Sequence, residues 1–238
     1  MSTRRLDWSP PELPVIGGGG FPLRHVWCVG RNYAEHAVEM GVDPRISDPV
    51  FFSKPAQAMG SYADIRWPEA TDRLDHEAEL VLFLSRGGRT VPASDWPERI
   101  FGFAVGVDLT RRSVQARLKS AGHPWEISKG FDQSAPVGPI CSAPDWQPTG
   151  GHAIELWVNG TIRQQGRLGE MIWPPGELLE RLSAELTLQA GDAVFTGTPA
   201  GVGPLRPGDR VRARVEGLPE LEFSIGRVDS AASDEVKS

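Results

Sequence analysis

Two glutamates separated by a single residue are the strongest chemical signal in this chain. Glu77 and Glu79 open a segment that becomes wholly apolar over residues 80–84. Such a run predicts a buried β-strand, in which alternate side chains face the same side, so both carboxylates point the same way. Two like charges at the mouth of a core repel each other, and burying either one unpaired is costly. A divalent cation between them would remove both costs; a solvated strand end is the equally open alternative.

Asp108 supplies a third candidate carboxylate. It follows the apolar segment 103–107 and precedes Thr110, which the spacing predicts as the N-cap of a helix over 111–120. The end of a strand beside a helix N-terminus is a common place for ligands and metals, although a plain capping role is also open. Three carboxylates without a histidine or cysteine beside them would favour a hard cation, so Mg²⁺ or Mn²⁺ fits better than Zn²⁺.

Two further pairs of residues have spacings that suit substrate chemistry. His36 and Glu39 are three residues apart in a segment of helical character, where the carboxylate can orient the imidazole as a general base for water. Arg112 and Gln115 share a face of the predicted helix, and an arginine near an open metal site can hold a substrate carboxylate. A solvated helix surface is the alternative for both pairs, and on spacing alone it is favoured for the first.

Lys129 and the loop 197–203 are candidates for stabilising negative charge. Lys129 lies among aromatic and glycine residues, where its ammonium can pair with a carboxylate or an oxyanion. The loop offers backbone N–H groups and the Thr198 hydroxyl for the same purpose, or it is simply a structural turn.

Composition excludes several classes of protein. The 238 residues carry a net charge of −6 without a basic stripe, which argues against nucleic acid as a partner. Two cysteines without a paired motif argue against a disulfide framework or a zinc knuckle. No apolar run approaches the roughly 18 residues of a membrane span, and residues 1–22 lack the apolar centre of a signal peptide. We therefore expect a cytoplasmic protein without a membrane partner.

The predicted elements are mostly strands. The glycine and proline content is high, with 27 and 21 residues, and suits a turn-rich β fold. Asn159-Gly160 predicts a hairpin turn, and residues 177–186 predict an amphipathic helix. Strands are expected at 25–29, 50–52, 79–84, 101–107, 154–158, 161–164 and 193–196. The fold class is therefore α+β with strands dominant. We expect an N-terminal arm over 1–22, one catalytic domain over 23–228 and a polar tail over 229–238.

Taken in order, these motifs resemble the fumarylacetoacetate hydrolase family over about residues 25–226. The matching segments are 29–33 with His36 and Glu39, 52–55, 76–80, 107–112, 125–129, 158–160 with Gln164, and 196–203. Each segment is weak alone, but the ordered set is specific. Segments 125–127 and 134–140 are most similar to the bacterial fumarylpyruvate hydrolases of gentisate degradation and the related acylpyruvate hydrolases.

The resemblance implies a fold and a site. The implied fold is a rolled, barrel-like mixed β-sheet with short flanking helices, in a homodimer. The implied cofactor is Mg²⁺ or Mn²⁺ held by Glu77, Glu79 and Asp108, with His36 and Glu39 on a segment that closes over the substrate. The remaining implied site positions are Lys129, Arg112, Gln115 and Thr198. One departure is Ser113, because family members often carry an acid there.

The implied activity is hydrolysis of the C–C bond of an acylpyruvate, a small 2,4-diketo acid. Fumarylpyruvate, cleaved to fumarate and pyruvate, is the favoured substrate, with His36 oriented by Glu39 as the base and Lys129 as a catalytic cation. Arg31 and Arg111 are both candidates for binding a second substrate carboxylate. Oxaloacetate decarboxylation, hydroxymuconate isomerisation or decarboxylation, and a non-catalytic binding protein on the same scaffold are the alternatives.

Overall fold

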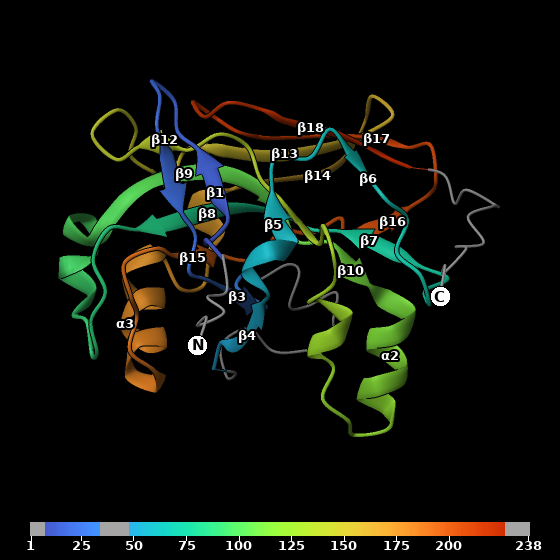
Figure 1. Ribbon diagram of the computed structural model, residues 1–238, viewed down its shortest axis with the longest axis horizontal. Helices are drawn as coiled ribbons and strands as arrows, with labels where there is room; N and C mark the ends of the chain where they lie inside the picture. Colours follow the sequence, from blue (N-terminus) through green and yellow to red (C-terminus); the bar gives the residue numbers. More distant parts are fainter. Residues whose placement is uncertain (1–7, 34–47, 227–238) are drawn as a thin grey trace, which may run out of the picture.

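A mixed six-stranded β-sheet forms the centre of the protein (Figure 1). The computed structural model describes residues 8–33 and 48–226. In spatial order the strands are β12 (Cys141–Ser142), β9 (Ile100–Val107), β8 (Ala78–Leu84), β15 (Asp192–Phe195), β3 (His25–Gly30) and β4 (Val50–Lys54). Strands β15 and β3 run parallel, and the other neighbours are antiparallel. All of them except the two-residue β12 coincide with the apolar runs from which the sequence predicts strands.

A five-stranded sheet lies over one face of the six-stranded sheet, in the upper part of Figure 1. Its order is β14 (Thr161–Arg167), β13 (Ala153–Val158), β17 (Arg210–Val215), β18 (Leu221–Ile225) and β6 (Asp64–Ile65). Asn159 and Gly160 close the hairpin between β13 and β14, and both have the positive φ that this tight turn requires. The predicted hairpin is therefore confirmed, as is the α+β class with dominant strands.

Strand β8 is buried on both faces. Leu80, Leu82 and Leu84 pack in the core that the five-stranded sheet shares. Val81 and Phe83 point the other way, into a second core that is covered by a hairpin of β1 (Glu12–Pro14) and β2 (Gly20–Pro22). The face of β8 that carries Glu79 is therefore buried, as is the opposite face with Ala78, Leu80 and Leu82.

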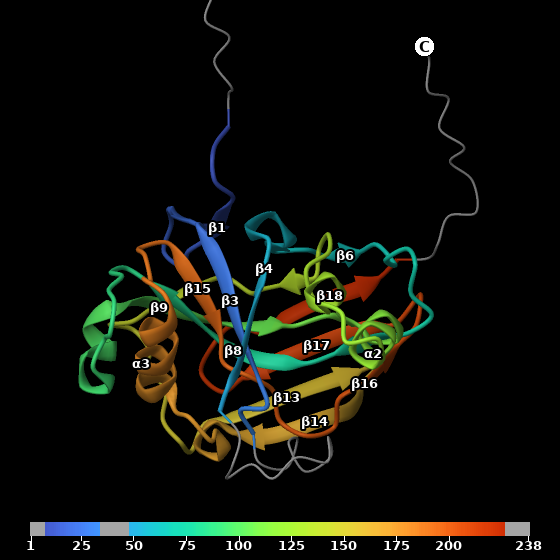
Figure 2. The same ribbon diagram turned by 90° about the horizontal axis from the view of Figure 1, so that it is seen from below.

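Two α-helices lie at opposite sides of the described part of the molecule, as Figures 1 and 2 show. Helix α3 (Pro175–Glu185) buries three of its leucines, as the amphipathic pattern predicts. Helix α2 (Arg112–Ser120) begins later than expected. Thr110 is not its N-cap, because it belongs to the short strand β10 (Thr110–Arg111) and is fully buried. Thr110 and Arg111 pair with β7 (Leu74–His76), and the helix begins at the next residue.

Shorter elements complete the described structure. They are the paired strands β5 (Met59–Gly60) and β11 (Ala135–Pro136), and the 3₁₀ turns η1 (Ala56–Ala58), η2 (Ala93–Arg99), η3 (Glu126–Ser128) and η4 (Leu168–Glu170). Within the described ranges no helix has the length and apolar character to cross a membrane. The helical segment predicted after Tyr33 lies outside the described residues, and the domain limits at residues 22 and 228 stay predictions.

One antiparallel pair of strands belongs to two sheets in succession. Strands β8 and β9 pair in the six-stranded sheet. Their extensions β7 (Leu74–His76) and β10 pair in a separate three-stranded sheet with β16 (Gly203–Leu205). The changeover falls at Glu77 on one strand and at Asp108 on the other, where the Asp108 N–H donates to the Glu77 carbonyl at 2.8 Å. The break between the sheets therefore brings two of the candidate carboxylates together.

Asn32 fixes the end of β3 against the end of β15. Its buried amide group donates to the carbonyls of Trp173 (2.9 Å) and Thr196 (2.7 Å), and its carbonyl accepts the Trp173 N–H at 2.7 Å. This one side chain therefore satisfies three buried backbone groups, and leaving such groups without a partner would destabilise the folded protein.

We expect Asn32→Leu to lower the free energy of unfolding by roughly 2–4 kcal/mol, because three buried backbone groups lose their partner. Chemical denaturation measures this value. Gln165→Leu, at an exposed position of β14, is the control and is expected to stay within about 0.5 kcal/mol of the parent. Equal stability of the two variants would contradict the role given to Asn32.

Candidate active site

Three buried carboxylates lie together where the strand pair changes sheets. Glu77, Glu79 and Asp108 each offer an oxygen atom, and these atoms lie within 4.8 Å of one another. Their exposed fractions are 7%, 1% and 0%. A solvated strand end is therefore wrong for the two glutamates. The capping role for Asp108 is also wrong, since α2 begins only at Arg112.

Three cations surround two of these carboxylates. The Lys129 ammonium donates to Glu77 and Asp108, at 2.7 Å each, and the buried Lys54 ammonium lies 2.8 Å from the other Asp108 oxygen. Arg112 donates to Glu77 at 2.5 Å and to Asp75 at 2.8 Å. Burial alone would lower the pKa values of Lys129 and Arg112, but their carboxylate partners outweigh it and raise both. Lys129 and Arg112 therefore stay charged.

Glu79 has no ion pair with any residue in the described ranges, although it is buried. Its carboxylate accepts the Gly197 N–H at 2.5 Å. Gly197 has a φ of +95°, and a Cβ there would lie 2.7 Å from the Asn32 Cβ, so only glycine brings this N–H so close. Burial, followed by the charges of Asp108 and Glu77, raises the pKa of Glu79 well above its ordinary value. Among the described residues, Glu79 is the carboxylate of the cluster that has no cation in direct contact.

The donor set fits a hard divalent cation. Three carboxylates supply only oxygen ligands, and Mg²⁺ holds opposed ligands about 4.2 Å apart, at twice its usual bond length of about 2.1 Å. The carboxylate oxygens of the cluster lie within 4.8 Å of one another, so one small cation can reach all three residues. A cation here would also provide the counter-charge that Glu79 lacks. Glu77, Glu79 and Asp108 are therefore the residues that could hold Mg²⁺ or Mn²⁺.

A cavity of about 220 Å³ opens onto the carboxylates. The predicted site residues that line it are Arg31, Glu77, Glu79, Arg112, Gln115, Lys129 and Thr198. Phe52 and Trp125 add an aromatic wall, with ring centroids 5.3 Å apart. His36 and Glu39, the predicted base and its partner, lie outside the described residues.

Arg112 is more constrained than the sequence suggests. Besides its bonds to Asp75 and Glu77, it donates to the Gln115 carbonyl oxygen at 2.7 Å. The guanidinium therefore fixes Glu77 and Gln115, while its predicted role in substrate binding stays a prediction. Ser113, at the position where the family often has an acid, bonds instead with the Thr71 hydroxyl at 2.9 Å.

Two residues of the site were missed by reasoning from the sequence. Lys54 follows an apolar strand, and only its burial among the carbonyls of Leu109, Lys129 and Ser134 reveals that it supports Asp108. Gln164 is the second such residue, and its buried side chain is also held by hydrogen bonds. Its carbonyl oxygen accepts the Ala78 N–H at 3.0 Å and lies 3.0 Å from His76 Nδ1.

Gln164 also orients the Thr198 loop. Its amide nitrogen donates to the Thr198 hydroxyl oxygen at 2.7 Å and to the Pro199 carbonyl at 2.9 Å. Because the hydroxyl accepts from Gln164, its own proton is free to turn toward the cavity. The only signal in the sequence for Gln164 was its place in the family motif.

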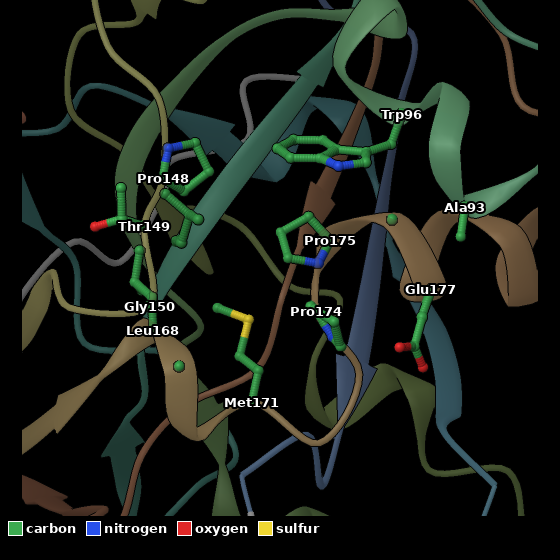
Figure 3. A pocket seen from close by; sticks show the side chains of 13 residues that line it. Ala93, Trp96, Pro148, Thr149, Gly150, Leu168, Met171, Pro174, Pro175 and Glu177 are labelled. Atoms are coloured by element: carbon green, nitrogen blue, oxygen red, sulfur yellow. The ribbon is translucent and has the colours of Figure 1, made fainter.

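A larger cavity of about 360 Å³ lies on the opposite face of β8 and is apolar (Figure 3). Trp96, Met171 and Pro175 project into it, and Leu80 from β8 also lines it. Successive strand residues face opposite sides, so Leu80 points away from Glu79. None of the three clustered carboxylates lines this cavity. Chemistry that uses the carboxylates therefore takes place in the cavity of about 220 Å³.

Comparisons with known proteins agree with this geometry. The sequence profile described as fumarylacetoacetate (FAA) hydrolase C-terminal matches residues 25–226. The structure is similar to fumarylpyruvate hydrolase from Pseudomonas aeruginosa in complex with Mn²⁺ and pyruvate. The TM-score is 0.92 and the identity 40%, over 95% of this chain and 100% of that one.

Two curated relatives extend the comparison. An uncharacterised protein of Pyrococcus horikoshii is 44% identical over 228 residues, which cover 94% of this chain and 98% of that protein. A mitochondrial oxaloacetate tautomerase of Arabidopsis thaliana is 38% identical over 203 residues, which cover 84% of this chain and 90% of that protein.

We expect Glu79→Gln to weaken Mn²⁺ binding at least tenfold without lowering the stability of the metal-free protein. The substitution removes a ligand charge, but that charge has no ion pair to lose, and an amide keeps the hydrogen bond from Gly197. Calorimetric titration with Mn²⁺ and denaturation in a chelator measure the two quantities. Glu69→Gln, at an exposed position, is the control. Unchanged Mn²⁺ affinity in the Glu79 variant would refute its role as a ligand.

Proposed function

The chain belongs to the fumarylacetoacetate hydrolase family, as its motifs predict, and we propose that it is a metal-dependent hydrolase of acylpyruvates. Fumarylpyruvate, cleaved to fumarate and pyruvate as in gentisate-type degradation, is the proposed substrate. The observation that carries this proposal is the buried cluster of Glu77, Glu79 and Asp108 at the base of a cation-lined cavity. The similarity to a fumarylpyruvate hydrolase that binds Mn²⁺ and pyruvate supports the same substrate class.

Glu77, Glu79 and Asp108 would hold Mg²⁺ or Mn²⁺. When bound, a divalent cation supplies Lewis-acid stabilisation of the negative charge that develops on the pyruvate half of the substrate. Arg112 keeps Glu77 in position through a direct bond, and Lys54 does the same for Asp108. These two cations therefore serve to position the ligands.

Lys129 and Thr198 are proposed to bind the substrate's oxygens. An ammonium has three N–H donors, and Lys129 uses two of them on Glu77 and Asp108, so one remains for the substrate. Thr198, whose oxygen accepts from Gln164, can donate its own proton. Donors that are already in place when an oxyanion forms lower the barrier, because they need no reorganisation.

His36 and Glu39 are proposed as the water-activating pair. Glu39 orients the imidazole, and His36 takes a proton from water while the hydroxide oxygen bonds to the distal carbonyl carbon of the substrate. The bond between that carbon and the CH₂ group then breaks. Its electron pair stays with the pyruvate half, which is protonated at the same carbon. The products are one carboxylic acid, which carries the oxygen of the water, and pyruvate, which has gained a proton.

A second candidate function is chemistry on oxaloacetate. The relatives that are named oxaloacetate tautomerases favour it, since the same ligands and cations would stabilise the enolate form of a small keto acid. Tautomerisation and decarboxylation need no activated water, and neither uses the proposed His36–Glu39 pair in that role. Hydroxymuconate isomerisation differs from hydrolysis in the same respect. The homodimer and the cytoplasmic location stay predictions.

A direct assay separates these functions. The purified protein with Mg²⁺ is given fumarylpyruvate, acetylpyruvate and oxaloacetate in parallel, and loss of the diketo or enol absorbance is followed. We expect hydrolysis of the acylpyruvates to have the highest kcat/KM. Faster turnover of oxaloacetate would favour the second candidate, and no turnover of any substrate would favour a non-catalytic binding protein.

We expect His36→Ala to reduce acylpyruvate hydrolysis by ~10²–10⁴-fold, the usual contribution of a general base. Binding of Mn²⁺, measured by titration, should be retained, because the proposed ligands are carboxylates elsewhere in the chain. Any oxaloacetate activity should also persist. Near-normal hydrolysis in this variant would rule out His36 as the base.

A further inference from the structure

One face of helix α2 carries polar residues along the cavity. Arg112, Gln115 and Lys119 are spaced by three and four residues, so they lie in a row on the same side of the helix, and all three line the cavity. Lys119 lies about 10 Å further along the helix axis than Arg112. Helical side chains tilt back toward the N-terminus, so the long side chain of Lys119 leans toward the carboxylate cluster.

Aromatic rings connect Lys119 to that cluster. The Lys129 ammonium, which touches Glu77, lies 5.2 Å from the centroid of Phe52. The Phe52 ring meets the Trp125 ring edge-on at 5.3 Å, and the Lys119 ammonium lies 5.0 Å from the Trp125 centroid. Three contacts of similar length thus lead from Lys129, which touches the proposed ligand Glu77, to a second cation along an aromatic wall. This wall suits a short, planar hydrocarbon chain.

Lys119 and Arg31 differ from the other cations of the cavity. Lys129 and Arg112 are paired with carboxylates, whereas within the described ranges neither Lys119 nor Arg31 has an ion pair. Burial, then the charges of Arg31 and Arg112, lower the pKa of Lys119. Two cations that repel each other at the mouth of one cavity would gain from an anion placed between them.

We propose that Lys119 and Arg31 bind a second carboxylate at the far end of the substrate's acyl chain. The cavity would therefore select acylpyruvates that are dicarboxylates over those with a neutral alkyl end. This inference rests on the proposed function and adds which acylpyruvates the enzyme prefers. The pyruvate half lies at Glu77, Glu79 and Asp108, the planar chain lies along Phe52 and Trp125, and the distal carboxylate reaches the outer cations.

Arg111, the other arginine considered for this role, lies in a different cavity with Glu69 and Phe131. Its guanidinium donates to the Ile127 carbonyl at 2.5 Å and lies 5.1 Å from the centroid of Phe131. It does not line the cavity of the carboxylate cluster. The specificity for a distal charge therefore belongs to Lys119 and Arg31.

The test compares two substrates in Lys119→Gln. We expect the ratio of kcat/KM for fumarylpyruvate to that for acetylpyruvate to fall by roughly three- to tenfold, mainly through KM, as for a charge pair that stays partly exposed. Lys119→Arg should restore the ratio. Arg117→Gln, an exposed cation elsewhere on α2, is the matched control and should keep the parental ratio. Arg31→Gln, measured in the same way, should lower it.

The salt dependence of this kcat/KM ratio distinguishes a charge contact of Lys119 from a purely structural role, which would not depend on ionic strength. Raising the ionic strength should lower the parental ratio and leave the ratio of Lys119→Gln less affected, since screening weakens only the charge contact. An unchanged ratio in Lys119→Gln, with the parent hydrolysing both substrates, would overturn the specificity role alone. Failure of the parent to hydrolyse either acylpyruvate would overturn the proposed function, and this inference with it.

Discussion

The burial of Glu79 with no paired cation among the described residues is the constraint on which the rest of the site depends. Three neighbouring carboxylates, Asp75, Glu77 and Asp108, are paired with four cations, which are Lys54, Arg73, Arg112 and Lys129. Glu79 has only a backbone N–H in the described structure. Leaving an ionised carboxylate buried and unpaired costs several kcal/mol or forces protonation. A divalent cation removes this cost, so a site that is unfavourable when empty becomes favourable when filled.

The fold creates this arrangement at a break between two sheets. If β7–β8 and β9–β10 were continuous ladders, their side chains would alternate regularly and meet the packed cores on both sides. Because both strands change sheets at the same level, Glu77 and Asp108 turn toward each other beside Glu79. The loop at Gly197 then approaches so closely that no side chain fits there. Long-range strand pairing thus sets the geometry of a charge cluster whose members are 2 to 31 residues apart in the sequence.

Local patterns were sufficient to predict much of the fold. The apolar runs predicted β8 and β9, Asn159-Gly160 predicted the hairpin, and leucine spacing predicted α3. Local patterns failed where tertiary pairing decided the outcome. Thr110 has the chemistry of an N-cap, but pairing with β7 drew it into a strand. Beyond its place in the matching segment 52–55, Lys54 gave no local signal, because a lysine at the end of a strand is ordinarily solvated. Only the assembled core shows the acid that it faces.

Crystallography with Mn²⁺ tests most directly whether the three buried carboxylates form a metal site. Crystals containing Mn²⁺ would give an anomalous difference map that locates the ion without reference to activity. We expect a strong peak roughly 2.0–2.3 Å from an oxygen of each of Glu77, Glu79 and Asp108. A map with no peak there under saturating Mn²⁺, or with the ion bound by other residues, would contradict it.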